Sequence, residues 1–251
     1  MSRHVTFMTI DDAEHYTSQE RADIIAAYPP HEREARAKGI PVLGSGRIFP
    51  VAEESIKVAP FRLPPFWPRI GALDFGWDHP SAAVELAYDT EGDVIYVTKA
   101  HRASQQTPAM QAITLKPWGA WLPWSWPRDG HRETLEGVGV ALANQYREYG
   151  LRMRGTHSQF PDGSVSVEAG LMTMLDRMQT DRFKVFDTLN DWFEEFRLYH
   201  RKDGIVVKLR DDLMSATRYG VMDIRHSIVN PAEFAKVRQQ TRMSDPLGDY
   251  R

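Results

Sequence analysis

From residue 69 onward, the hydrophobic positions of the chain gather into short, dense runs that polar, turn-rich segments separate. Apolar runs of about four to eight residues bounded by turn signals are typical of β-strands. They predict strands over residues 70–75, 83–88, 94–100, 119–124, 183–186 and 205–209. The sequence DTEGD between the second and third of these runs predicts a hairpin turn.

Other segments repeat their apolar residues every three to four positions, which is the spacing of one face of an α-helix. This spacing predicts helices over residues 108–116, 133–149, 167–178, 189–204 and 211–225. Pro108 suits a helix start, and Gly150 suits a helix end. Three successive strands, followed by helices that alternate with strands, predict an α/β fold in which helices pack on the faces of a mixed sheet.

Residues 1–68 differ from this pattern because they are polar, charged and helix-leaning. Thr17 or Ser18 is expected to cap a helix that runs to Tyr28, where two prolines stop it. A second short helix is expected over residues 31–39. These features indicate an irregular, partly helical segment ahead of the α/β domain.

The stretch PFRLPPFWP is rich in proline and suits a stiff connector, so we place a boundary at its end. The last residues of the chain are polar, and we expect them to be flexible. The sequence is therefore divided into residues 1–68, residues 69–228 and residues 229–251.

Composition limits the functions that are possible. The chain has 251 residues, a formal net charge of −3 and no cysteine. Disulfides and thiolate metal ligands are thereby excluded, and any metal must be held by carboxylate, imidazole or backbone groups. No apolar stretch is long enough to span a bilayer, and the N-terminus lacks the apolar region of a signal peptide. We expect an intracellular protein.

Four aspartates stand where strands end or a helix begins. Asp74 ends the first strand, Asp129 follows the fourth, and Asp211 and Asp212 open the last helix. If the first and fourth strands are parallel neighbours, their carboxyl ends meet at one edge of the sheet, where α/β proteins place their sites. Clustered carboxylates repel one another unless divalent cations lie between them, and oxygen ligands favour Mg²⁺ or Mn²⁺. Two such ions are the machinery of displacement at phosphorus.

Each of these aspartates also has a plainer interpretation. Asp129 before Gly130 is typical of a turn, and Asp211 and Asp212 suit the N-terminus of any helix. Asp74 is harder to explain in this way, because an unpaired carboxylate in an apolar strand is costly. The combination of the positions therefore carries the hypothesis.

Asp78, close behind Asp74, is interpreted as turn chemistry or at most as an assisting group. The tripeptide at residues 74–76, Asp-Phe-Gly, also occurs in protein kinases as a metal-binding motif. The glycine-rich loop, the lysine strand and the catalytic loop of a kinase are absent from the sequence. We therefore regard the match as coincidental.

Two further groups of residues have open interpretations. The run WGAWLPWSWP suits stacking on sugars or bases, although its alternation favours core packing for Trp118, Trp121 and Trp124. Basic residues crowd near the last strand and helix, either as a solvated face or as a track for a phosphate backbone. These residues are Arg197, Arg201, Lys202, Lys208, Arg210 and Arg218.

In this context, the sequence resembles the C-terminal nuclease of the large terminase subunit of tailed bacteriophages and prophages. The stretches that carry the resemblance are ALDFGWDHPSAAVELA, WPRDG, VEAGLMTMLDRMQTDRFKVF, LNDWFEEFRLYHRKDG and KLRDDLMSATRYGVM. The resemblance implies a ribonuclease H-like fold and a metal-dependent endonuclease that cuts concatemeric viral double-stranded DNA with two Mg²⁺ or Mn²⁺ ions.

The resemblance also implies roles for single residues. Asp74, Asp129 and Asp212 match the three metal-binding catalytic positions of the family, with Asp211 as a helper and Asp78 as an accessory position. From the basic cluster near the last strand and helix, and not from the resemblance, the candidate DNA-binding residues are Arg201, Lys202, Lys208, Arg210 and Arg218. The implied partners are double-stranded DNA and, in the full motor, the portal protein and the small terminase subunit. The expected setting is the host bacterial cytoplasm, with no membrane contact and an isolated chain that is monomeric.

Residues 1–68 resemble the end of the terminase ATPase domain, in TIDDAEHYTSQE, AAYPPHEREARAKGIP and LGSGRIFPV. The phosphate-binding motif GxxxxGK[ST] is absent, so we expect no ATPase activity from this sequence alone.

Three alternatives to the nuclease stay open. One is a non-catalytic module that docks to DNA or portal protein. The second is another ribonuclease H-like nuclease, such as a resolvase or a transposase. The third is a glycoside hydrolase with paired carboxylates.

Overall fold

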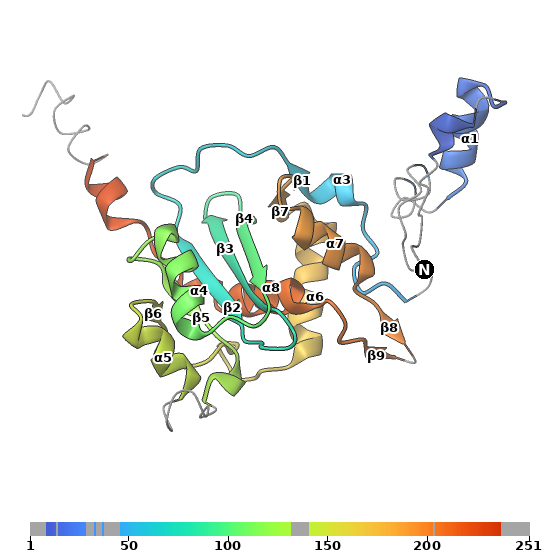
Figure 1. The fold of residues 1–251 in the computed structure, drawn as a ribbon. Coiled ribbons are helices and arrows are strands. Elements are labelled where there is room, and N and C mark those ends of the chain that lie inside the picture. The colour runs from blue at the N-terminus through green and yellow to red at the C-terminus, as the bar shows by residue number, and fades with distance from the viewer. Residues whose placement is uncertain are drawn as a thin grey trace, which may run out of the picture.

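The structure, a computed structural model, describes residues 9–13, 15–28, 33, 37, 46–131, 141–202 and 204–236. Within these residues, the central feature is a seven-stranded sheet with the order β1-β7-β4-β3-β2-β5-β6 (Figure 1). Strands β2, β3 and β4 form an antiparallel meander, and the other neighbouring strands pair in parallel. The strands are β1 (Lys57–Val58), β2 (Arg69–Asp74), β3 (Ser81–Asp89), β4 (Val94–Ala103), β5 (Pro123–Ser125), β6 (Arg152–Met153) and β7 (Phe183–Phe186).

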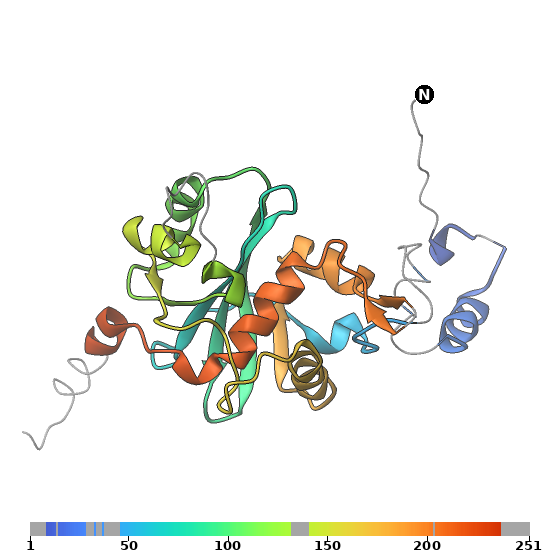
Figure 2. The ribbon, with the colours of Figure 1, turned by 90° about the horizontal axis from the view of Figure 1, so that it is seen from below.

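Helices cover both faces of this sheet (Figures 1 and 2). Leu213 of α8 shares one core cluster with Val84 of β3, whereas Leu115 of α4 shares the other with Leu73 of β2. The helices of the first face are α6 (Val167–Gln179), α7 (Asn190–Leu198) and α8 (Asp212–Met222); those of the second are α4 (Pro108–Leu115) and α5 (Leu142–Glu148). The predicted mixed sheet with helices on its faces is confirmed.

The remaining elements are short. They are α1 (Ser18–Ala26), α3 (Glu53–Ile56), β8 (Arg201–Lys202), β9 (Ile205–Val206) and the 3-10 turns at Ile10–Asp12, Lys116–Trp118, Arg128–His131 and Ile224–His226. In the parts of the chain that the structure describes, no helix has both the length and the apolar character to cross a membrane. Thr17 caps α1 as predicted, accepting a hydrogen bond from the backbone N–H of Glu20.

Two segments lie largely outside the described residues. The helix predicted over residues 31–39 is one of them, and so is the first part of the helix predicted over residues 133–149. The described tail ends at residue 236 and includes a helical stretch over residues 231–236, where Glu233 forms an ion pair with Arg69 at 2.9 Å. Flexibility of the tail beyond that point stays a prediction.

The strand predicted over residues 119–124 was wrong in its start, because β5 begins only at Pro123. A 3-10 turn precedes Gly119, whose φ of 137° breaks an extended run, and a further turn joins the N–H of Leu122 to the carbonyl of Gly119. The core interpretation of Trp124 is confirmed, since its side chain is fully buried. Trp118 is half-buried and stacks on Trp124 at 5.6 Å.

The helix predicted over residues 189–204 ends at Leu198, so its second half was wrong. The extended backbone of Tyr199 ends the helix, and its buried ring packs against Phe49. The strand predicted over residues 205–209 is only two residues long, and it pairs with β8 rather than with the main sheet.

Residues upstream of position 68 contribute to the main core. Lys57 and Val58 form the edge strand β1, which pairs with β7, and Phe49 and Ile56 are buried in the same cluster as α7 and α8. The proline-rich stretch 60–68 therefore connects two strands of one sheet. Division of the chain at residue 68 stays a prediction.

The turn between β3 and β4 is anchored through Asp93. Although partial burial acts in the opposite direction, hydrogen bonds from Tyr88, Arg182 and Arg177 lower the pKa of Asp93 to about 2. The ionised carboxylate thus adds stability that is complete above the ordinary aspartate pKa and is lost as the pH falls from about 4 towards 2.

We predict that Asp93→Asn is less stable than the wild type at pH 6 and that this difference shrinks at pH 2.5. Asn tolerates the positive φ of 51° at this position, so the backbone is not strained. Urea unfolding at the two pH values measures the effect. Asp187→Asn, at an exposed aspartate outside the described ion pairs, is the control and should show no such convergence. A constant difference between wild type and Asp93→Asn at both pH values would contradict the prediction.

Candidate active site

The strand register brings two of the predicted aspartates to one edge of the sheet. Strands β2 and β5 are parallel neighbours, with Gly71 opposite Trp124 and Ala72 opposite Ser125. Asp74 ends β2, and Asp129 lies in the 3-10 turn that follows β5. The condition on which the hypothesis depended, parallel adjacency of these two strands, is therefore met, and their carboxyl ends point the same way.

Helix α8 carries the other two aspartates to the same edge. Asp212 is its first residue and Asp211 its N-cap. The helix can lie close on the sheet because Gly220 has no side chain. A Cβ there would be 2.5 Å from Leu86 and 3.2 Å from Ala72. At the far end of α8, Asp223 accepts a hydrogen bond from Ser125 of β5 at 2.7 Å. The helix is thereby fixed to the strand whose end leads to Asp129.

A cavity of about 330 Å³ lies at this edge. All four aspartates, Asp74, Asp129, Asp211 and Asp212, line it. Asp78 is exposed and is not among the lining residues, so the structure does not bring this accessory candidate to the cavity. Its neighbour His79 does line the cavity, although sequence reasoning had placed no role on it.

The carboxyl groups of the cavity affect one another electrostatically. Burial raises the pKa of Asp74 well above its usual range, the charges of Asp129 and Asp212 raise it further, and Arg218 acts in the opposite direction. Burial also raises the pKa of Asp212. The charge of Asp211 raises this pKa further, and His79 lowers it. A positive charge in the cavity would relieve this mutual repulsion.

The donor set fits a hard divalent cation, because the lining aspartates supply carboxylate oxygens and no sulfur. The side chains are gathered without forming a ready-made cage: among the described residues, no three His, Asp or Glu side chains are arranged as a metal site. The carboxylates would therefore have to close around an ion.

The five candidate DNA-binding residues are distributed unevenly. Lys208 and Arg218 line the cavity. Arg201 forms an ion pair with Glu168, and Arg210 forms one with Glu194, so both have partners within the chain. Lys202 is exposed and lies outside the cavity lining.

Helix α8 has a cap that its own sequence does not provide. Asp211 makes no side-chain hydrogen bond at the N-cap position. The fully buried carboxylate of Glu195 on α7 instead accepts hydrogen bonds from the backbone N–H of Leu213 at 2.6 Å and of Met214 at 3.3 Å. Glu195 thus satisfies the free amides at the start of the helix that presents Asp212.

Arg102 at the end of β4 holds this cap in place. Its guanidinium group donates to Glu195 at 2.9 Å and to Glu194 at 3.0 Å. Burial raises the pKa of Glu195 to about 7, while Arg102 and the amide of Leu213 act in the opposite direction. Sequence reasoning missed Glu195 and Arg102 because only the fold brings β4, α7 and α8 together.

A mixed sheet flanked by helices, with carboxylates gathered where two adjacent parallel strands end, defines a ribonuclease H-like domain. Residues 71–223 match the family described as "Terminase RNaseH-like domain", and residues 1–56 match the N-terminal part of the T4-like large terminase subunit. The chain belongs to the large terminase subunit family.

Individual relatives agree with this assignment. The chain is 48% identical over 222 residues to the large terminase subunits of Enterobacteria phage LP7 and Salmonella phage P22; this stretch is 88% of the chain and 46% and 44% of those proteins. The chain thus spans less than half the length of these curated relatives.

Solved structures agree as well. The nuclease domain of the P22 large terminase superposes with a TM-score of 0.70 at 43% identity, covering 76% of this chain and 98% of that domain. The large terminase of a thermophilic bacteriophage, solved in complex with ADP, has a TM-score of 0.57 at 16% identity, covering 87% of this chain and 55% of that one, and shares the fold.

Proposed function

We propose that this chain is an endonuclease that hydrolyses phosphodiester bonds of double-stranded DNA with the help of divalent cations. The observation that carries the proposal is the convergence of Asp74, Asp129 and Asp212 on one cavity at the carboxyl ends of β2 and β5. Similarity to the P22 large terminase nuclease domain supports the same chemistry.

In this proposal, Asp74, Asp129 and Asp212 would hold two Mg²⁺ or Mn²⁺ ions, with Asp74 as the central ligand. Bound cations supply a water of lowered pKa as nucleophile and stabilise the leaving oxygen. Asp211 lies beside Asp212 and adds negative charge to the same end of the cavity. The chain's own task is to hold these carboxylates at one point while the substrate is bound.

Two basic residues are suited to the substrate side of the cavity. Lys208 is exposed at the cavity, where an ammonium group suits a backbone phosphate. Arg218 is buried, and its guanidinium group lies over the ring of Tyr219 at 4.4 Å. We propose that Arg218 balances the charge of Asp74 and does not bind DNA, because its charge lowers the pKa of that carboxyl group.

The family points to genome packaging as the setting. In this proposal the substrate is concatemeric viral DNA in the host cytoplasm, and the portal protein and the small terminase subunit are partners in the full motor. The sequence contains no phosphate-binding loop of the GxxxxGK[ST] type, so the proposal assigns cutting and not ATP hydrolysis to these residues.

Incubation with supercoiled plasmid tests the proposal. We expect nicking and linearisation in the presence of Mn²⁺ or Mg²⁺ and none in the presence of EDTA. A four-way DNA junction in the same assay separates a resolvase, which would cut the junction in preference to plasmid. DNA binding without cleavage, together with no Mn²⁺ binding by calorimetry, would replace the proposal with the docking module.

Lys208→Ala is expected to weaken binding of duplex DNA at low salt and to reduce the slope of log affinity against log salt by about one, as the loss of one phosphate contact implies. Lys116→Ala removes the same charge from an exposed site outside the cavity lining and serves as the control. Fluorescence anisotropy across a salt series with EDTA present measures both. Equal effects of the two substitutions would remove Lys208 from the DNA path.

A further inference from the structure

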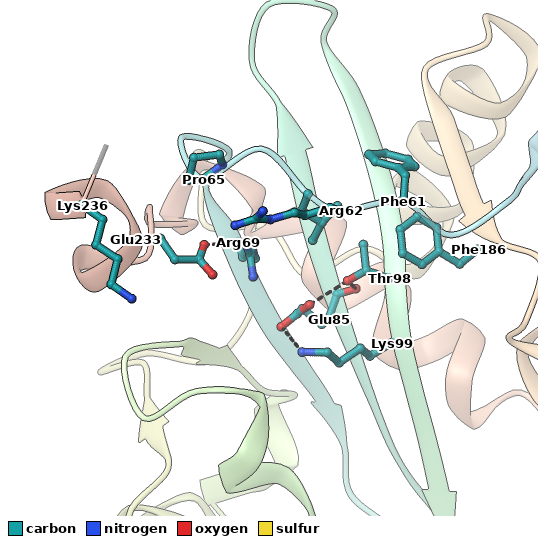
Figure 3. A pocket seen from close by; sticks show the side chains of 11 residues that line it. Phe61, Arg62, Pro65, Arg69, Glu85, Thr98, Lys99, Phe186, Glu233 and Lys236 are labelled. Atoms are coloured by element: carbon teal, nitrogen blue, oxygen red, sulfur yellow. Dashed lines mark hydrogen bonds and ion pairs between the residues drawn. The ribbon is translucent and has the colours of Figure 1, made fainter. Parts of the chain in front are cut away.

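A second and larger cavity lies at the other end of β2. Its volume is about 470 Å³, and it is lined by the connector between β1 and β2, by strands β2, β3 and β4, and by the last described turn of the chain (Figure 3). Arg69 at this end of β2 is five residues from Asp74, which corresponds to about 17 Å along a strand. The cavity is therefore separate from the acidic site.

The two acidic residues of this cavity already have partners. Glu85 is buried in the wall, where Thr98 donates to it at 2.8 Å and Lys99 forms an ion pair with it at 3.0 Å. Glu233 forms an ion pair with Arg69 at 2.9 Å. Their charges are thus balanced by two of the four cations that line the cavity.

The other two cations, Arg62 and Lys236, form no ion pair within the described residues, so the cavity has an excess of positive charge. The buried Nε of Arg69 also has no hydrogen-bond partner there. Arg62 and Lys236 come from segments far apart in the sequence, yet both line this cavity. Unpaired cations and an unused donor at one end suit an anion with several acceptor oxygens.

The opposite end of the cavity is aromatic. Figure 3 shows Phe61 and Phe186 together at one end and Glu233 and Lys236 at the other, with Arg62 between them. Phe61 contacts Phe186 edge-on at 5.4 Å and keeps 40% of its surface exposed. A ligand that fills both ends would combine a flat ring with a multiply charged anion.

We propose that this cavity binds a nucleotide, with its base against Phe61 and its phosphates beside Arg62 and Lys236. The volume lies in the range of small-molecule sites. The nucleotide is either a free nucleoside phosphate or one unit of a single nucleic-acid strand, since both present the same ring and phosphate. Binding would join the connector to the last described turn across β2.

Calorimetry with the full chain in EDTA tests this inference independently of the nuclease proposal, because the acidic site is then without metal. The probes are the four nucleoside diphosphates, inorganic pyrophosphate, a short oligodeoxythymidylate and an aspartate-rich peptide. We expect saturable binding of at least one nucleoside diphosphate. If the oligonucleotide competes with the nucleoside diphosphate, the ligand is a unit of a nucleic-acid strand. If it does not compete, the ligand is a free nucleotide.

Three variants locate the binding. Arg62→Ala and Lys236→Ala are each expected to weaken nucleotide binding on the order of tenfold, the effect of losing one charge-assisted hydrogen bond. Phe61→Leu should weaken nucleotide binding and leave pyrophosphate binding unchanged. Lys116→Ala, at an exposed lysine outside the cavity lining, is the control. Circular dichroism verifies that each variant is folded.

Three results would overturn the inference. The first is no saturable binding of any nucleoside diphosphate or of the oligonucleotide. The second is a nucleotide affinity of Arg62→Ala and of Lys236→Ala that equals the affinity of the control Lys116→Ala. The third is saturable binding of an aspartate-rich peptide in place of the nucleotides, which would make the cavity a protein-docking site.

Discussion

Asp74→Asn is expected to abolish metal-dependent cleavage of plasmid DNA while the protein stays folded. The substitution keeps the size of the side chain and removes its charge, so the cavity loses the central carboxylate of the proposed metal site. A loss of about a thousandfold, equivalent to about 4 kcal/mol in the barrier, is the expected order of magnitude. Plasmid linearisation in Mn²⁺ measures it.

The same variant should be no less stable than the wild type at pH 7. Burial and the neighbouring aspartates raise the pKa of Asp74 in the folded protein, so holding this group ionised costs stability, and this cost grows as the pH rises above the unfolded-state pKa. A neutral Asn avoids it. Thermal unfolding at pH 7 should therefore give an equal or higher melting temperature for Asp74→Asn.

Asp78→Asn is the matched control, because it makes the same chemical change at an exposed aspartate outside the cavity lining. It should cleave as fast as the wild type. Cleavage by Asp74→Asn at the wild-type rate would contradict the assignment of the site. An equal loss in Asp78→Asn would show that this residue has a role that its position in the structure does not indicate.

Replacement of Glu195 is expected to weaken metal activation without touching a proposed ligand. Glu195 caps α8 at Leu213 and Met214, directly after Asp212, so its loss frees the start of the helix that positions this carboxylate. Loss of a group that orients a metal ligand typically costs about 10- to 100-fold in metal affinity. Glu195→Ala should raise the Mn²⁺ concentration needed for half-maximal cleavage by that factor.

Glu195→Gln keeps an oxygen acceptor for the two amides but loses the charge that pairs with Arg102. We expect it to restore part of the Mn²⁺ affinity, because Glu195→Ala leaves the amides of Leu213 and Met214 without this acceptor. Hydrogen exchange at Leu213 and Met214 should be faster in Glu195→Ala than in Glu195→Gln. Cleavage at saturating Mn²⁺ should approach the wild-type rate in the glutamine variant.

Glu194→Ala controls for the general effect of removing a carboxylate from α7. Glu194 pairs with Arg102 and Arg210 but makes no hydrogen bond to the amides at the start of α8. The Glu194→Ala substitution should leave the Mn²⁺ concentration for half-maximal cleavage unchanged. If Glu194→Ala and Glu195→Ala raise that concentration equally, Glu195 acts through the charge around Arg102 and not as a cap.

The main candidate for the site was accessible from the sequence because its signal is local. Asp74 interrupts an apolar strand, and its cost there is a property of the strand itself. The strands that end at Asp74 and precede Asp129 were predicted from short apolar runs, and the structure places both aspartates at one cavity with Asp212. Asp78 looked equivalent in sequence, but the turn after β2 leaves it exposed.

Other parts of the fold have no local signal. Strand β1 is two residues long and is a strand only because it pairs with the edge of β7, and strand β8 forms where the predicted helix was expected to continue. In both places, tertiary contacts override the propensity of the segment. The start of β5 was misplaced because the turns around Gly119 are set by backbone geometry and not by hydrophobicity.

The α/β class, the central meander and the acidic character of the site followed from the sequence, since apolar periodicity and the cost of a charge in a strand are local properties of the chain. The groups that support that site became visible only in the packed fold. The cap from Glu195 to α8 and its clamp by Arg102 join β4, α7 and α8, and the cavity of Arg62 and Lys236 joins the connector to the last described turn. Contacts between distant segments depend on how the elements pack, so local sequence patterns do not predict them.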